Sequence, residues 1–293
     1  TREDDIRHDY YHSVAAVSVK AGLDEEGKPN AWLQRSTFPS IFSTFNPAQV
    51  GGADLELGMG VTDIPFAVEN LRCENGHAAA HVRIGWLRSV CNIFHVFGTS
   101  SFVDELAVKA GSDQVEYLLD LIGEPRMIDP AAEGATAWNY GRELEEYPID
   151  TGRLCNVLKT VAEKSEWGKS LPEGEGLGIA VHRSFLSYIA SVVHVKVGKD
   201  GSIEIPRIDM AYDCGLVVNP ERARAQMEGS AVFGVSLAML GEITAKDGVI
   251  EQSNFHDYLI SRMPEAPRKV VCHHVKSDAL PAGVGEPGVP PIA

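Results

Sequence analysis

Strand-like runs paired across short turns are the sequence feature that most limits how this chain can fold. The β-branched run Val192–Val197 is followed by the turn Lys199–Ser202 and by a second run, Ile203–Met210. Asp-Gly between two such runs favours an antiparallel hairpin, because glycine adopts the backbone of a tight turn without steric cost. Turn residues predict two further hairpins: Val14–Thr37, turning at Asp24–Gly27, and Glu242–Gln252, turning at Lys246–Gly248.

Helix-start and helix-stop residues predict helices between and after these hairpins. Asn219 can cap a helix that begins at Pro220, carries Glu221 in its first turn and runs to about Leu240. Glycines inside that helix, Gly229 and Gly234, indicate close approach of a backbone or a ligand. The other predicted helices start near Phe102 (capped by Ser100 or Ser101 and ended by Gly111) and run over Gln114–Leu121 and 151–165.

The remaining segments complete an α+β fold of mixed type, mostly antiparallel hairpins with packed helices. Residues 79–88 and Lys269–Val275 are predicted strands, and residues 38–64 are predicted to be an irregular loop with a short helical piece. We expect the chain to divide into two parts, residues 1–165 and residues 166–293. The chain starts at Thr1 and stops at Ala293, within an apparent loop, so we expect a piece of a larger subunit.

Charge and cysteine usage exclude several classes of protein. The net charge of −15 comes from 26 basic and 41 acidic residues, and such a surface repels phosphate backbones, so no nucleic-acid partner is expected. No apolar run reaches the roughly 18 residues of a membrane span, and none is predicted. The five cysteines are scattered without a CxxC pair, which argues against an iron–sulfur cluster or a disulfide framework in this chain.

The stretch Gly283–Pro291 holds an acid, Glu286, between glycines and prolines. Glycines permit close approach of the backbone to a ligand, and prolines limit the motion of the loop. A carboxylate on such a rigid loop is suited to act as a general base inside a pocket. The residues alone leave open a surface loop with a solvated glutamate.

Two further polar side chains are candidates for ligand contacts. Arg88 lies among apolar neighbours in Gly85–Cys91, where it and nearby N–H groups could bind an anionic or oxo ligand. The alternative is an arginine that reaches the surface or pairs with an acid. Gln226, in the second turn of the helix from Pro220, could donate to a ligand oxygen. Capping at Asn219 and close packing at the glycines would equally explain that region.

Common catalytic motifs are missing. No HExxH, Walker loop, GxSxG, or GxGxxG after a strand occurs, which weakens zinc-hydrolase, NTPase and serine-hydrolase interpretations. His273 and His274 are adjacent on a predicted strand, so their side chains point to opposite faces and cannot share a metal in the same way. His256 is interpreted as a structural hydrogen-bonding residue.

Taken in order, several segments resemble the molybdopterin-binding subunit of the xanthine oxidase superfamily, in its isoquinoline 1-oxidoreductase and aldehyde oxidoreductase branch. The resemblance covers nearly the whole chain, and the ordered set is far more specific than any single motif. The segments that carry it are Thr1–Asp5, Trp86–Val90, Ser101–Ala107, Gly178–Phe185, Asp213–Pro220, Ala225–Gly229, Gln252–Tyr258 and Gly283–Pro291.

The resemblance implies a molybdenum hydroxylase that oxidises N-heteroaromatic compounds or aldehydes with water as the oxygen source. Its cofactor would be a molybdenum–pterin group, either molybdopterin or its cytosine dinucleotide, and no protein side chain would ligate the metal. Glu286 matches the glutamate of the family's GxGExxxPP loop, which serves as the catalytic base. The residues expected to contact the cofactor are Arg88, Ser89, Val90, Cys91, Gln226 and Gly285.

The sequence departs from the family pattern at several positions, and the missing segments indicate which partner chains to expect. Cys91 stands where the family usually has glycine, while Ser100 and His194 replace common glutamates. The family's GGxFG and MGQG loops are not in this sequence, so the resemblance implies that the remaining part of the molybdenum subunit supplies them. A small subunit with 2Fe–2S clusters would carry electrons, and a small molecule would be the substrate. The alternative is a cofactor-free homologue that serves as a structural, partner-binding chain.

Overall fold

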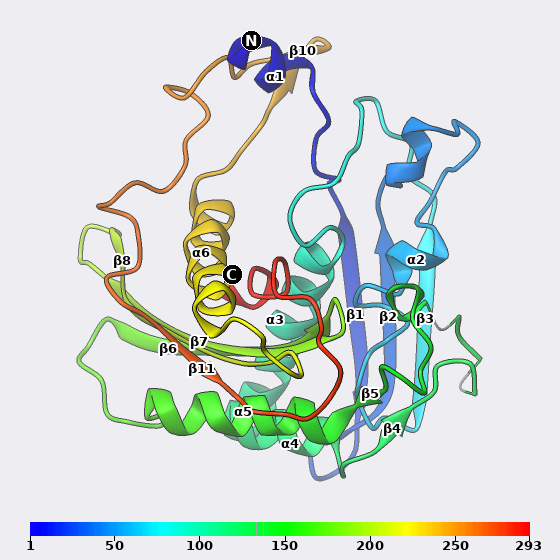
Figure 1. Ribbon diagram of the computed structural model, residues 1–293, viewed down its shortest axis with the longest axis vertical. Coiled ribbons are helices and arrows are strands. Elements are labelled where there is room, and N and C mark those ends of the chain that lie inside the picture. Colours follow the sequence, from blue (N-terminus) through cyan, green and yellow to red (C-terminus); the bar gives the residue numbers. More distant parts are fainter. Residues whose placement is uncertain (133, 137) are drawn as a thin grey trace.

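The computed structural model describes every residue except 133 and 137, and groups of strands alternate with helices along the chain (Figure 1). The helices are α1 (Arg2–His8), α2 (Asp54–Leu57), α3 (Asn92–Ala110), α4 (Gln114–Ile122), α5 (Thr151–Ser165) and α6 (Pro220–Met239), with 3-10 turns η1 (Ile41–Thr44), η2 (Asn139–Gly141) and η3 (Pro290–Ile292). The strands are β1 (Ala16–Leu23), β2 (Pro29–Thr37), β3 (Asn70–Gly76), β4 (Met127–Ile128), β5 (Ile149–Asp150), β6 (Glu175–Ser184), β7 (Ser187–Val197), β8 (Ile203–Asp213), β9 (Ala245–Lys246), β10 (Val249–Ile250) and β11 (Val270–His274).

A four-stranded sheet with the order β11-β8-β7-β6 separates α5 from α6 (Figure 1). The strands β6, β7 and β8 pair antiparallel, and β11 joins β8 in parallel. Alternate residues of β7 serve the two faces: Tyr188 and Val192 pack with α5, while Ile189 packs with α6. Both faces are therefore apolar, and each fully buried aliphatic side chain contributes roughly 2 kcal/mol.

A three-stranded sheet, β1-β2-β3, lies at the other side of the molecule (Figure 1). The predicted hairpin β1–β2 is confirmed, and β3 adds to β2 in parallel. The prediction of a strand over residues 79–88 was wrong. In that segment Ile84 makes one isolated bridge to Tyr11, and both its N–H and its C=O bond the Thr44 hydroxyl. The Thr44 side chain and the single bridge to Tyr11 thus satisfy backbone groups that a neighbouring strand would otherwise bond.

Helix α3 begins at Asn92, about ten residues before the predicted start near Phe102. The serines that look like caps, Ser100 and Ser101, lie inside the helix. Its first turns carry weak helix formers, yet His95 and Val96 are buried there, so tertiary packing outweighs intrinsic propensity. Gly98 belongs to this packing, because a Cβ at that position would lie 3.0 Å from Val17 Cγ1.

The other predicted helices and hairpins are confirmed. Asp113 caps α4 by accepting from the N–H groups of Val115 and Glu116. Helices α5 and α6 and the hairpins β7–β8 and β9–β10 lie where they were predicted. The α+β class with hairpins and packed helices is therefore confirmed. Within the described residues, every helix is too short or too polar to cross a membrane.

Candidate functional site

Arg88 joins three segments that are far apart in the sequence. Its Nε donates to Gly285 O at 2.5 Å. Its Nη2 lies 3.2 Å from Gln226 O, 3.0 Å from Gln226 Oε1 and 2.9 Å from Ser230 Oγ. A planar guanidinium with five donors can make such contacts at once. Arg88 thereby fastens its own loop to helix α6 and to the C-terminal loop.

Glu286 is held by the residue next to Arg88. The N–H of Ser89 donates to Glu286 Oε2 at 2.8 Å, and the Ser89 hydroxyl donates to the Glu286 carbonyl at 2.6 Å. Ser89 is fully buried, whereas Glu286 is half-buried. These bonds fix both the main chain and the carboxylate of Glu286. In the described part of the chain, Oε1 of that carboxylate has no hydrogen-bond partner.

The loop that presents Ser89 has an unusual backbone. Ser89 has φ of 81° and Val90 has φ of 48°, both in the left-handed region. This conformation costs an L-residue about 1–2 kcal/mol, and a β-branched residue adopts it rarely. The N–H of Val90 bonds Leu87 O at 2.9 Å, which closes the turn. Such strain persists where the surroundings hold it, as the bonds from Ser89 to Glu286 do here.

Helix α6 presents its contacts on one face. Asn219 caps the helix by accepting from Arg222 N, which sets where the turns begin. Gln226 and Ser230 are four residues apart and therefore share a face. The buried Ser230 hydroxyl donates to Gln226 O at 2.7 Å and accepts from Arg88. Ser230 therefore anchors the arginine to the helix.

Glycines decide how closely the C-terminal loop packs on α6. A Cβ on Gly288 would lie 2.7 Å from Ser230 Cβ, and a Cβ on Gly234 would lie 2.7 Å from Ile292 Cβ. The close approach predicted at Gly234 is therefore made by the chain's own C-terminal segment. By contrast, a Cβ on Gly285 would meet no atom within 4 Å. The space beside Gly285 is open.

The turn between β6 and β7 forms hydrogen bonds with the C-terminal loop at Gly283. Phe185 and Leu186 both have positive φ, 49° and 69°. The Phe185 carbonyl accepts from Gly283 N at 3.0 Å, and the Ser187 hydroxyl donates to Gly283 O at 2.6 Å. Sequence reasoning missed this support and also missed Ser230. The short Ser184–Ser187 connection between two strand-like runs was the available signal for the turn.

The structure brings five of the predicted site residues together and sets two side chains apart. Arg88, Ser89, Gln226, Gly285 and Glu286 form the network described above. The side chains of the other two residues, Val90 and Cys91, are buried in an apolar cluster with Phe38, Ile41, Met59 and Ile84.

Cys91 has an ordinary backbone, with φ of −70°, at the start of α3. Burial raises the pKa of its thiol, so the thiol stays protonated near neutral pH. Its side chain therefore behaves as a small apolar group.

The donors of the site fit an anionic, oxygen-rich group. Burial lowers the pKa of Arg88, the nearby Glu286 carboxylate opposes this shift, and the guanidinium remains charged. Arg88 Nη1 and Gln226 Nε2 have no acceptor among the described residues, and Gln226 is exposed. The open side of Gly285 leaves room for a ligand near these donors. No group of three or more His, Cys, Asp or Glu in the described chain is arranged to hold a metal ion.

A family model matches part of this chain. Residues 158–267 match the molybdopterin cofactor-binding domain. The match runs from within α5 past the end of α6 and therefore includes Gln226 and Ser230. This stretch of the chain thus resembles a molybdopterin cofactor-binding domain, and the donor set described above fits such a cofactor.

Curated relatives extend this likeness to almost the whole chain. The chain is 26% identical over 303 residues to the beta subunit of isoquinoline 1-oxidoreductase from Brevundimonas diminuta, covering 99% of this chain and 34% of that protein. It is 26% identical over 306 residues to a nicotinate dehydrogenase subunit of Pseudomonas putida, covering 100% of this chain and 24% of the relative. The chain therefore spans about a quarter to a third of the length of these relatives.

A solved structure agrees in fold. The aldehyde oxidoreductase of Desulfovibrio desulfuricans matches with a TM-score of 0.73 at 12% identity, covering 98% of this chain and 46% of that one. The resemblance predicted from the ordered motifs is confirmed: this chain is related to the molybdopterin-binding subunits of the xanthine oxidase family.

Proposed function

We propose that this chain is the catalytic part of a molybdenum hydroxylase that oxidises N-heteroaromatic compounds or aldehydes with water as the oxygen source. The observation that carries the proposal is the network in which Ser89 holds Glu286 while Arg88 ties Gln226 to Gly285. Relatives named for isoquinoline and nicotinate support the heteroaromatic class, and a structural neighbour named for aldehydes supports the other.

Glu286 is the proposed general base. Its Oε2 accepts from the Ser89 N–H, so Oε1 is the oxygen that accepts a proton. The Ser89 hydroxyl fixes the backbone of the same residue, which limits the freedom of the carboxylate. A base held in this way needs little reorganisation when the proton moves.

The cofactor contacts are proposed for the remaining network. Arg88 Nη1 and Gln226 Nε2 would donate to oxygen or nitrogen acceptors of the molybdenum–pterin group, and Gly285 leaves room for it. Ser89, Val90 and Cys91 would approach it through their backbone. When bound, the cofactor supplies the two-electron redox chemistry that no side chain can provide. Residues 1–165 and 166–293 are proposed as the first and second parts of this cofactor-binding region.

The proposed enzyme also contains partner chains. Because the chain spans only part of its relatives, the remaining part of the molybdenum subunit is a proposed partner. A small subunit with 2Fe–2S clusters is the proposed electron-transfer partner. A structural, cofactor-free chain is the second candidate, because Arg88 already has several acceptors within the protein and does not need a ligand to be ordered.

Molybdenum content separates the two candidates. The metal would be measured by elemental analysis on the complex isolated with all its native partner chains. Near-stoichiometric molybdenum is expected, followed by turnover in a screen of heteroaromatic compounds and aldehydes. A complex with intact partners and no molybdenum would support the structural candidate and leave Glu286 without a catalytic role.

A further inference from the structure

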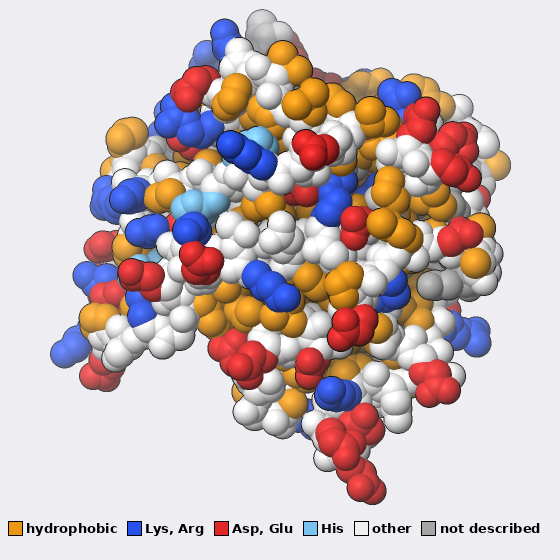
Figure 2. Space-filling model, turned by 60° about the horizontal axis from the view of Figure 1, so that its bottom comes forward, with side chains coloured by type: hydrophobic (Ala, Val, Ile, Leu, Met, Phe, Trp, Pro, Cys, Tyr) orange, Lys and Arg blue, Asp and Glu red, His pale blue; other side chains and the backbone are white. Residues whose placement is uncertain are grey.

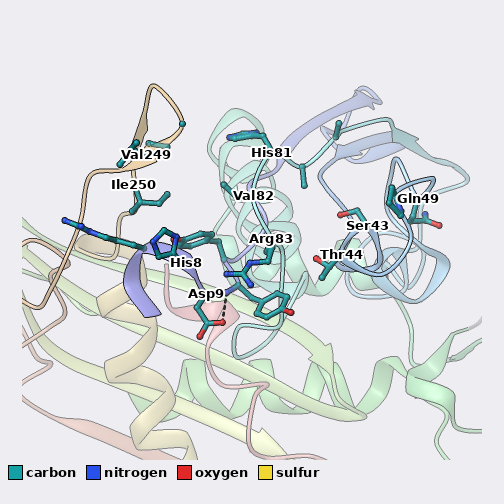
Figure 3. Close-up of a pocket in the computed structure, with 18 of the residues that line it drawn as sticks. His8, Asp9, Ser43, Thr44, Gln49, His81, Val82, Arg83, Val249 and Ile250 are labelled. Atoms are coloured by element: carbon teal, nitrogen blue, oxygen red, sulfur yellow. Dashed lines mark hydrogen bonds between the residues drawn. The ribbon is translucent and has the colours of Figure 1, made fainter. Parts of the chain in front are cut away.

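A hollow separate from the contacts of Arg88 and Glu286 lies beside the N-terminal helix (Figure 3). Its volume is about 830 Å³, within the range of roughly 300–1,000 Å³ that is common for small-molecule sites. Its walls come from α1 and the residues after it, from segments 43–50 and 79–83, and from the β9–β10 hairpin. Four segments that are distant in sequence thus border one open space.

Basic side chains outnumber acidic ones in the lining of this hollow. Arg7, Arg83, His8 and His81 line it, and Asp9 is the one carboxylate among its lining residues. Neither arginine forms an ion pair with a residue that the structure describes. On the face shown in Figure 2, by contrast, basic side chains lie among acidic ones. A positive hollow on a chain with a net charge of −15 is a local site of attraction for anions.

Apolar and aromatic groups stand beside these charges. The Arg83 guanidinium lies over the Tyr10 ring, 5.1 Å from its centroid. Val82, Val249 and Ile250 border the same space (Figure 3). A guanidinium on an aromatic face remains able to bind a carboxylate through its planar fork of donors. The wall therefore offers a donor fork for an anion and an apolar surface for the body that carries it.

Hydrogen bonds preform the floor of the hollow. The N–H of Tyr11 donates to Arg83 O at 2.8 Å, and Tyr11 O accepts from Gly85 N at 3.0 Å. The Tyr11 hydroxyl donates to Ile6 O at 2.8 Å, which ties α1 to the same floor. Backbone pairing thus sets the position of the Arg83 main chain and ties two of the four walls together before a ligand binds.

We propose that this hollow binds a small aromatic carboxylate, with the carboxylate on the Arg83 and Arg7 guanidinium groups and the ring against Tyr10 and Val82. The proposal concerns binding alone and does not rest on the oxidoreductase function. A failure here leaves the molybdenum measurement and the role of Glu286 untouched, and the reverse also holds.

The test is calorimetric titration of the chain, isolated with its copurifying partners, with benzoate, benzamide and inorganic phosphate. Saturable benzoate binding is expected, with benzamide about tenfold weaker because it lacks the charge. Arg83→Gln should weaken benzoate binding about tenfold, and Arg7→Gln should weaken it less. The exposed Arg142 lies outside the hollow, so Arg142→Gln serves as the control and should leave binding unchanged.

Three results would overturn the proposal. Equal binding of benzamide would show that the arginines do not recognise charge, and equal binding of phosphate would show that the apolar wall contributes nothing. Absence of benzoate binding would show that the hollow is not a site for aromatic carboxylates. Thermal unfolding of each variant is measured in parallel. If Arg83→Gln fails to fold, unchanged benzoate binding by Arg7→Gln would itself overturn the proposal.

Discussion

The backbone N–H of Ser89 and the Oε2 of Glu286 meet at 2.8 Å, although 197 residues separate them along the chain. The donor belongs to a strained turn, since Ser89 and Val90 both have positive φ. The acceptor belongs to a loop of glycines and prolines. Each segment therefore stabilises the conformation of the other, and the carboxylate is oriented before any ligand arrives.

Replacing Glu286 by glutamine removes a proton acceptor with little change in shape. The side-chain oxygen of the new amide can still accept from the Ser89 N–H. We expect turnover of a loaded complex to fall by about 10²–10⁴-fold, with thermal stability and molybdenum content nearly unchanged. The exposed Glu251 is a matched control, and Glu251→Gln should keep full activity. Wild-type turnover by the Glu286 variant would exclude it as the base.

Replacement by alanine should have different effects at Gly285 and Gly288, two glycines of one loop. A Cβ on Gly288 would lie 2.7 Å from Ser230 Cβ, so Gly288→Ala should lower the free energy of unfolding by about 1–3 kcal/mol. Gly285 has no atom within 4 Å of the same position. Gly285→Ala should therefore leave urea stability unchanged and lower cofactor content, if the cofactor fills that space. Unchanged cofactor content in Gly285→Ala would remove Gly285 from the contact set.

Asp63 should make stability fall as the pH rises. Burial raises the pKa of Asp63 to about 6, against the Gly60 N–H and the Arg183 charge, which lower it. The folded chain therefore holds more protons than the unfolded chain between about pH 4 and pH 6, and stability declines across that window. Asp63→Asn should raise the free energy of unfolding by about 1–2 kcal/mol near pH 7 and by little below about pH 4.

Urea denaturation near both pH values measures this effect. The exposed Asp104 lies in α3, and Asp104→Asn serves as the matched control for removal of a carboxylate from the surface. An equal gain for Asp63→Asn at both pH values would show that packing, rather than ionisation, explains the change.

Glu166 ends α5 in a left-handed conformation, with φ of 58° and ψ of 48°. Glycine is preferred at this position because it has no Cβ to clash there. Glu166→Gly should raise the free energy of unfolding by about 1 kcal/mol. Glu163→Gly, an exposed site inside the same helix, should lower it by about 1 kcal/mol, and the two variants can be compared by thermal unfolding. The same sign for both would refute the argument.

Cys91 is expected to matter for stability and not for cofactor content. Its side chain is buried in the apolar cluster around Phe38 and Met59. Cys91→Gly should lower the free energy of unfolding by about 1–3 kcal/mol through a cavity and added chain entropy, and Cys91→Ala should cost less. Molybdenum content should stay at the wild-type level in both variants. Loss of the metal without loss of stability would place the thiol at the cofactor.

Local signals were predictable from the sequence, and long-range contacts were not. Asp113 and Asn219 cap helices through bonds to residues two or three positions away, so their helices were found. The segment 79–88 was misread because its partners, Tyr11 and Thr44, are remote in sequence. The predicted start of helix α3 was too late, because its first turns are stabilised by burial rather than by intrinsic helix propensity.

In the candidate site, too, residues with a local signal were found and a long-range contact was missed. Arg88, Gln226 and Glu286 drew attention by residue type and by the order of their motifs. Ser230 did not, because a serine inside a helix has no distinctive pattern and its partner Arg88 is 142 residues away.

The turn at Phe185 and Leu186 has a consequence for the timing of assembly. Gly283, at the base of the loop that carries Glu286, bonds the Phe185 carbonyl and the Ser187 hydroxyl, the latter 96 residues earlier in the chain. Such distant contacts form late in folding, because the intervening chain must first be brought together. We therefore expect a cofactor to be inserted only after the β6–β7 hairpin has closed, because that turn positions the loop beside which the cofactor would bind.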